Sequence, residues 1–321
     1  MPFILDGLLR GLAFIGRYGT QGFALSIFLG LALPQFAAAA RPLLAVTIFV
    51  FVAITFARVD ASAMRALLRR PAPLALASAW LVFAPAALVA AALAVVGRDA
   101  IDPGLVLGLA VLAGAPPIMS APAVAMLLGF QPTLIMAAVL STTIAAPLLS
   151  PVVANLVAGA VVPLDLAVLI RRLLLLIGGA VLAAGVLRWW LGDARIRAHK
   201  AHFDGLGVVM YFLFAVAAMD GVLAAAMADP GRVARFLLVA FALSLAGFAG
   251  AWFLLRPLRP ADRFVLGYGT GQRNMGLLIA ALGASTPDTT FLFFALAQFP
   301  IYLMPQIIKP LARRLAPVLE G

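Results

Sequence analysis

The stretch Gly-Thr-Gly-Gln-Arg-Asn-Met-Gly-Leu-Leu-Ile-Ala-Ala-Leu-Gly, at 269–283, places polar and helix-breaking residues inside an apolar segment. A related stretch, Gly-Ala-Pro-Pro-Ile-Met-Ser-Ala-Pro-Ala-Val-Ala-Met-Leu-Leu-Gly, lies at 114–129 in the first half of the chain. A helix in lipid must satisfy its own backbone polar groups, so unwound backbone survives only where protein or a wet cavity covers it. Corresponding interruptions in the two halves of a polytopic chain are typical of the binding site of a secondary transporter.

The composition supports a membrane protein. Of the 321 residues, 65% are hydrophobic and 11% are charged, and the mean hydropathy is +1.13. A soluble domain could not cover that much apolar surface, so we expect an all-α integral membrane protein in a lipid bilayer. The net charge of +11 comes from basic residues in short loops, which indicates membrane topology rather than a nucleic-acid partner. Disulfides and thiol chemistry are excluded because the chain has no cysteine.

Apolar runs of about 20 residues predict ten transmembrane helices in one domain, 1–321. The predicted spans are 20–38, 41–57, 74–97, 104–128, 132–158, 173–192, 205–227, 233–256, 264–283 and 289–309. The loops assigned to the cytoplasm are the more basic ones, with Arg10, Arg17, Arg58, Arg65, Arg69, Arg70, Arg188, Arg195, Arg197, Lys200, Arg256, Arg259, Arg263, Arg313 and Arg314. This asymmetry predicts a multi-pass protein of the cell (inner) membrane with both termini cytoplasmic. Arg171 and Arg172 run against it, and we expect them to snorkel to the headgroups.

The two halves also correspond outside the interruptions. Gly129 corresponds to Gly283 and Pro147 to Pro300, with a further proline after each, Pro151 and Pro305. We therefore expect two inverted five-helix repeats, about 20–158 and 163–313, each with one broken crossing helix. Inverted repeats provide the two related packings that alternating access needs. The alternative is that glycine, alanine and proline merely permit close helix packing.

At these residues the chain resembles the bile acid:sodium symporter family. The resemblance rests on Asp60-Ala-Ser-Ala-Met-Arg65, on the first crossing from Pro116-Pro117 to Met126, on Gly271-Gln272-Arg273-Asn274-Met275-Gly276-Leu277, and on Pro147-Leu148-Leu149-Ser150-Pro151. It covers the whole chain and implies crossing helices in a core domain beside a panel domain, moving amphipathic anions.

The sequence departs from that family where the resemblance implies sodium ligands. Where the resemblance implies a glutamate, this chain has Gly269, and where it implies a glutamine four residues later, this chain has Arg273. Other polar positions that the resemblance implies are occupied by Pro122-Ala123 and by Trp80. At about 4 Å and an effective dielectric constant near 20, a fixed positive charge repels Na⁺ by roughly 4 kcal/mol. We therefore predict that Na⁺ is not a partner, while protons remain a candidate coupling ion.

Arg273 is the leading candidate for substrate binding. A charged group within a membrane segment is costly, and arginine offers a rigid fork for an anionic head group. Two roles stay open: a ligand for the anionic head, or a structural ion pair that replaces the lost sodium charge.

Asp220 is the one acidic residue placed clearly inside an apolar run, within the predicted span 205–227. We expect either a salt bridge, with Arg273 as the obvious partner, or a proton-coupling carboxylate. A hydrated position near the outer interface is the alternative.

Weaker candidates surround these two. Asn274 and Ser120, which we align with each other, together with Gln272, Thr270 and Pro117, are predicted to line the crossing. Ser141, Thr142 and Thr143 are secondary polar candidates, although hydroxyls in membrane helices more often bond to their own backbone. No catalytic, metal or cofactor motif is visible, so an enzyme is not expected.

The sequence therefore predicts a secondary transporter of a small or amphipathic organic anion that works by alternating access. We expect its transport to be coupled to protons or to no ion. Two alternatives remain: a sodium-dependent symporter with relocated ion ligands, and a non-transporting sensor or scaffold derived from a carrier.

Overall fold

A computed structural model describes residues 19–59 and 71–319. These residues are almost entirely helical and contain no strand. Within these residues, seven helical segments are long and apolar enough to cross a membrane, so the chain is a multi-pass membrane protein. They are Pro34–Ala57, Pro71–Val96, Thr133–Val161, Leu166–Ala198, Lys200–Ala228, Pro230–Leu254 and Asp288–Leu315.

These seven segments coincide with seven of the ten predicted spans. The remaining three, 20–38, 104–128 and 264–283, are each divided into shorter helices. Proline and glycine cause the divisions: Pro34 starts a new helix in the first, and the two quoted stretches interrupt the others. The motif at 60–65, together with Arg10, Arg17, Arg69 and Arg70, lies outside the described residues.

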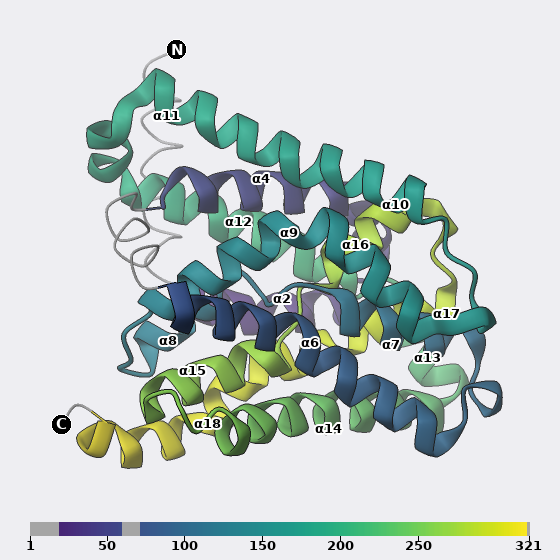
Figure 1. The fold of residues 1–321 in the computed structure, drawn as a ribbon. Coiled ribbons are helices and arrows are strands. Elements are labelled where there is room, and N and C mark those ends of the chain that lie inside the picture. Colours follow the sequence, from purple (N-terminus) through teal and green to yellow (C-terminus); the bar gives the residue numbers. More distant parts are fainter. Residues whose placement is uncertain (1–18, 60–70, 320–321) are drawn as a thin grey trace. The chain divides into compact units, whose positions relative to one another are not determined.

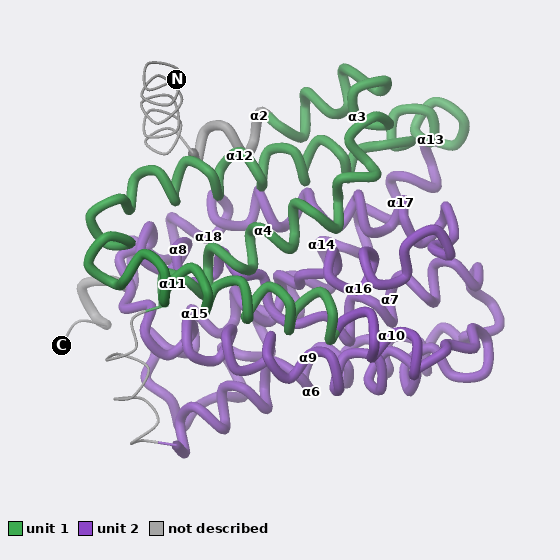
Figure 2. The backbone as a smooth tube through the Cα atoms, turned by 90° about the horizontal axis from the view of Figure 1, so that it is seen from above, with its two compact units in different colours: residues 1–59, 174–229 green, residues 60–173, 230–321 purple. Residues whose placement is uncertain are grey.

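The chain forms two compact units, each assembled from both halves of the sequence (Figure 2). Unit 1 comprises 1–59 and 174–229, and unit 2 comprises 60–173 and 230–321. The chain therefore passes from unit 1 to unit 2, returns to unit 1 and ends in unit 2.

Unit 1 is built from the helices of residues 19–57 and 174–228. Its helices are α2 (Gly19–Ala32), α3 (Pro34–Ala40), the 3₁₀ turn η1 (Arg41–Leu43), α4 (Leu44–Ala57), the π-helical turn η4 (Leu174–Gly178), α11 (Gly179–Ala198), α12 (Lys200–Ala218) and α13 (Val222–Ala228). Both α11 and α12 pack on α4, and α2 packs on α12. At Gly30 a Cβ would lie 2.8 Å from the Cβ of Met219, so glycine permits the close approach of α2 to α12.

Unit 2 contains both predicted crossing helices. Its helices are α6 (Pro71–Val96), η2 (Arg98–Ala100), α7 (Pro103–Gly114), α8 (Ala121–Leu127), α9 (Thr133–Ala158), η3 (Gly159–Val161), α10 (Leu166–Leu173), α14 (Pro230–Leu254), α15 (Pro260–Gly271), α16 (Met275–Leu282), η5 (Gly283–Ser285), α17 (Asp288–Leu296) and α18 (Gln298–Leu319). Here α7 packs against α9 and α17, and α14 packs along α15 (Figure 1). Phe264, Phe293 and Phe294 are fully buried in this core.

Arg172 makes contacts that the sequence did not predict. Its guanidinium donates hydrogen bonds to the carbonyl oxygens of Ala281 (2.8 Å) and Leu282 (3.1 Å). These carbonyls end α16, and a helix C-terminus attracts a positive charge. The residue therefore fixes α10 to α16, and the π-helical turn follows directly after this anchored helix.

Candidate functional site

The first interruption separates α7 from α8. Asp102 caps α7 by accepting hydrogen bonds from the backbone N–H groups of Gly104 (2.9 Å) and Leu105 (3.2 Å), and Pro103 follows at the first helical position. The helix ends at Gly114, where a Cβ would lie 2.6 Å from the Ser150 carbonyl oxygen of α9. Residues 115–120 are unwound before α8 begins.

The second interruption separates α15 from α16 and is shorter, at 272–274. Like α7, the helix α15 starts with a proline, Pro260. Arg259 precedes it and donates a 2.9 Å hydrogen bond to Asp262. That hydrogen bond and the negative charge of Asp262 raise the pKa of the Arg259 side chain.

The two interruptions meet, as the sequence predicted. Pro117 and Arg273 form an isolated antiparallel bridge. The Ile118 N–H donates to the Gln272 carbonyl at 2.9 Å, and the Asn274 N–H donates to the Pro116 carbonyl at 2.8 Å. Backbone groups that leave the helices are thus satisfied by the other interruption, which is what an apolar environment demands.

Ser120 and Asn274, which the sequence aligned with each other, are the N-cap residues of α8 and α16. The backbone pairing itself does not include Ser120: Asn274 pairs with Pro116, and Gln272 pairs with Ile118. The first interruption is longer than the second, so Ser120 lies beyond the paired residues. Both α8 and α16 are followed by a glycine with positive φ, Gly129 (87°) and Gly283 (60°).

Arg273 is buried at this crossing, with 3% of its surface exposed. Its guanidinium donates to the Ala115 carbonyl just beyond α7, and a 3.5 Å contact reaches the Gly269 carbonyl in the last turn of α15. Both acceptors are at helix C-terminal ends, which carry partial negative charge. The Nε atom is buried without a hydrogen-bond partner.

The positive charge of Arg273 is not neutralised by a carboxylate among the described residues of its own unit. No carboxylate among the described residues of unit 2 lies within 4.0 Å of the guanidinium; the one ion pair found in that unit joins Arg259 to Asp262. Carbonyl dipoles lower the cost of burying the charge but leave it formally uncompensated. The crossing is therefore an electropositive centre within unit 2.

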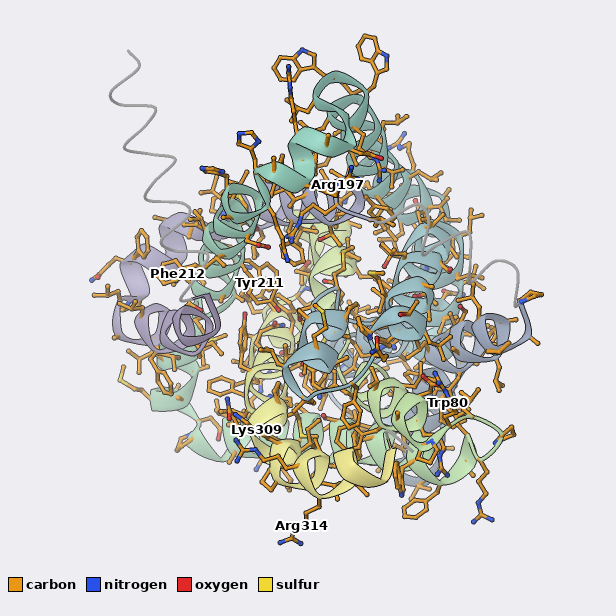
Figure 3. The ribbon with its side chains drawn as sticks, turned by 90° about the vertical axis from the view of Figure 1, so that its left-hand side faces the viewer. Trp80, Arg197, Tyr211, Phe212, Lys309 and Arg314 are labelled. Atoms are coloured by element: carbon orange, nitrogen blue, oxygen red, sulfur yellow. The ribbon has the colours of Figure 1, made fainter. Side chains whose placement is uncertain are left out.

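Side chains from α6 and α9 close the crossing beside Gly269. Trp80, labelled in Figure 3, donates from its indole Nε1 to the Thr270 hydroxyl at 2.9 Å. A Cβ on Gly269 would lie 2.9 Å from Ile135 Cδ1 and 3.4 Å from Leu81 Cδ2. Apolar atoms thus occupy the space in which a longer side chain at 269 would sit.

The helix α14 packs against α15 and contacts the second interruption through Ser244. Gln272 donates from Nε2 to the Ser244 hydroxyl at 2.6 Å, while its Oε1 is buried without a partner. A Cβ on Gly271 would lie only 2.4 Å from the Ser244 carbonyl oxygen. Glycine is therefore required at 271 for α14 and α15 to approach this closely.

The hydroxyls of α9 behave mostly as predicted. Ser141 and Thr142 donate to the backbone carbonyls of Ala137 and Ala138, each at 2.7 Å. Thr143 is different, because its hydroxyl is buried without a partner. Thr270, besides accepting from Trp80, donates to the Leu266 carbonyl at 2.7 Å.

The remaining candidates differ in exposure. Pro117 and Gln272 are buried, and their backbones contribute to the crossing. Asn274 and Ser120 are partly exposed. These two side chains are therefore the polar groups best placed to meet a bound molecule near the crossing.

Asp220 has a partner other than the one the sequence favoured. Its carboxylate lies 2.9 Å from the guanidinium of Arg41, and both residues belong to unit 1. Asp220 sits in the turn between α12 and α13, and Arg41 begins the 3₁₀ turn between α3 and α4. The predicted span 41–57 begins at Arg41, and no pattern in the sequence pairs that residue with Asp220.

Sequence reasoning missed Ser244 and the Ala115 carbonyl. Ser244 lies in an unremarkable apolar helix, and a backbone acceptor carries no sequence signal. Within the described residues, no group of three or more histidine, cysteine, aspartate or glutamate side chains could hold a metal ion. No protein-family model matches this chain, and no curated protein matches it in sequence.

Proposed function

We propose that this protein is a secondary transporter for a small or amphipathic organic anion and works by alternating access. The observation that carries the proposal is the crossing, where two interrupted helices are paired through Pro117 and Arg273. The guanidinium of Arg273 is buried there without a carboxylate partner in the part of unit 2 that the structure describes. Interrupted helices that meet inside a polytopic protein are the recurring substrate site of secondary carriers.

The electrostatics support an anion. Besides the charge of Arg273, the N-terminal end of α16 lies directly after the second interruption, and its N-cap, Asn274, makes no capping hydrogen bond with its side chain. Helix N-termini favour negative charge. A carboxylate near Asn274 and Ser120 would meet a positive field without having to displace a protein carboxylate.

The same geometry argues against sodium coupling. Ile135 and Leu81 fill the space beside Gly269, and Arg273 occupies carbonyl oxygens that would otherwise be free to bind a cation. Proton coupling, with Asp220 as its carboxylate, or movement without a coupled ion is therefore the proposed mode of transport.

The overall architecture we propose is ten spans in two inverted repeats, as in the bile acid:sodium symporter family. Three features support it: the reciprocal hydrogen bonds of the crossing, a proline at the start of both α7 and α15, and the left-handed glycines after α8 and α16. The division into two units, each drawn from both halves, agrees with a core and a panel domain.

The direct test is uptake by reconstituted proteoliposomes. Purified protein is screened for thermal stabilisation by a set of carboxylates, and the best one is used as radiolabelled substrate. We expect saturable uptake that is unchanged when choline replaces sodium. Uptake should be lost in Arg273→Ala and retained in Arg314→Ala, a control that removes an exposed arginine on α18 (Figure 3).

Two results would contradict the proposal. A strict sodium requirement would favour a symporter with relocated ligands. Absence of binding and uptake for every carboxylate would favour a carrier-derived protein that does not transport.

A further inference from the structure

The C-terminal ends of α7 and α15 converge on one side chain. Ala115 is the residue directly after α7, and Gly269 lies in the last turn of α15; their carbonyl oxygens both accept from Arg273. The last carbonyls of a helix have no partner within the helix and concentrate its negative partial charge. Two such ends facing one point form a site for a cation.

The cation at this point is part of the chain. In carriers with broken helices, unwound carbonyls and half-helix C-termini bind the coupling ions, while the half-helix N-termini face the anionic substrate. Here Arg273 supplies the positive charge from within the second interruption, and its neighbours Gln272 and Asn274 are fixed by backbone hydrogen bonds to the first.

We propose that the Arg273 guanidinium is a tethered cation, which keeps the carbonyl site of α7 and α15 permanently occupied, and that removing it opens a site for a free monovalent cation. The consequence for coupling rests on the proposed transport function, since a carrier loaded with its own cation needs no external one. The cation site itself is a property of unit 2 and can be tested without any substrate.

The test measures the thermal stability of purified full-length protein in chloride salts of choline, sodium, potassium and guanidinium. Wild type should melt at the same temperature in all four salts at equal ionic strength, with guanidinium kept at about 50 mM or less. Arg273→Gln should melt roughly 5 °C or more below wild type in choline. Sodium, potassium or guanidinium should restore much of that loss, rising with the logarithm of concentration.

Glutamine is the variant of choice because its amide oxygen would add a third oxygen to those of Ala115 and Gly269, and oxygen ligands suit hard cations. Arg273→Lys keeps the tethered charge and should remain insensitive to the salt. Arg172→Gln is the matched control: Arg172 also donates to two carbonyls at a helix end, but at a partly exposed position where water can replace it. This control should lose stability without rescue by any cation.

Several results would overturn the proposal. They are an Arg273→Gln protein as stable as wild type in choline, one destabilised equally in every salt, or one that yields no folded protein in any of the salts. Rescue of Arg172→Gln by the same cations would also overturn it, because the effect would then not be specific to the crossing. The two proposals can also be separated. If wild type does not transport carboxylates but the cations restore the melting temperature of Arg273→Gln, the tethered cation is supported and the transport function is contradicted.

Discussion

The Asp220 carboxylate lies 2.9 Å from the Arg41 guanidinium, and this ion pair joins the turn between α12 and α13 to the 3₁₀ turn η1 between α3 and α4. The Arg41 side chain is 40% exposed and the Asp220 side chain 18%. Partly exposed pairs contribute little to stability, since solvent screens them. A role for Asp220 in coupling is therefore compatible with easy separation of the pair.

We expect Arg41→Gln and Asp220→Asn each to lower the free energy of unfolding by about 1 kcal/mol or less. The double variant should lose little more than either single variant, because both changes break the same pair. Denaturation in detergent, followed by circular dichroism, measures the three losses. Fully additive losses would show that the two side chains act independently.

Asp220→Asn should abolish the stimulation of anion uptake by an inward proton gradient, since asparagine cannot be protonated in the relevant range. The control is Asp193→Asn, which also removes an ion pair of unit 1, with Arg188, but at a half-exposed carboxylate. Proteoliposomes with an imposed pH difference provide the measurement. Full retention of pH-dependent uptake in Asp220→Asn would remove its coupling role.

Gly271→Ala should be strongly destabilising. The new Cβ would lie 2.4 Å from the Ser244 carbonyl oxygen, and backbone cannot move as easily as a side-chain end. Overpacking of this kind costs about 1–3 kcal/mol. Gly185→Ala is the control: its Cβ would meet nothing within 4 Å, and alanine should stabilise α11 by up to about 1 kcal/mol. Equal melting temperatures for the two variants would contradict the packing described here.

The meeting of the two interruptions could be predicted because lipid offers no hydrogen-bond partners to the polar groups of an unwound backbone. Unwound backbone in lipid needs a partner, and two interruptions of similar composition, one in each half, can supply partners to each other. The self-bonding of Ser141 and Thr142 was predictable for a related reason, since a short hydroxyl in a helix reaches its own preceding turn.

The partners of the charged side chains could not be predicted in the same way. Arg273 donates to backbone carbonyls, which every residue carries, so nothing in the sequence distinguishes Ala115 from its neighbours. Asp220 pairs with Arg41 because α12 packs beside η1, and such packing depends on the tertiary fold rather than on any local pattern.

Trp80→Phe should lower the free energy of unfolding by about 1 kcal/mol, since it removes the hydrogen bond from the indole to Thr270 and keeps an aromatic ring. Thr270→Val removes the same bond from the other side, and the two losses should not add. Trp190→Phe, on a side chain that is largely exposed, should change stability by less than about 0.5 kcal/mol. Additive losses in the Trp80 and Thr270 double variant would contradict a direct interaction.

Ser244→Ala should cost about 1–3 kcal/mol, because the buried amide of Gln272 would then lose its acceptor while its Oε1 already lacks a partner. The double variant Ser244→Ala with Gln272→Met removes both polar groups and keeps the side-chain length, so we expect it to be more stable than Ser244→Ala alone. The crossing should survive in the double variant, since Gln272 pairs with Ile118 through its backbone carbonyl. Thermal denaturation compares the stability of Ser244→Ala with that of the double variant. The control is Ser141→Ala, which we expect to be nearly neutral. A double variant less stable than Ser244→Ala would mean that the Gln272 side chain stabilises the crossing through contacts other than Ser244.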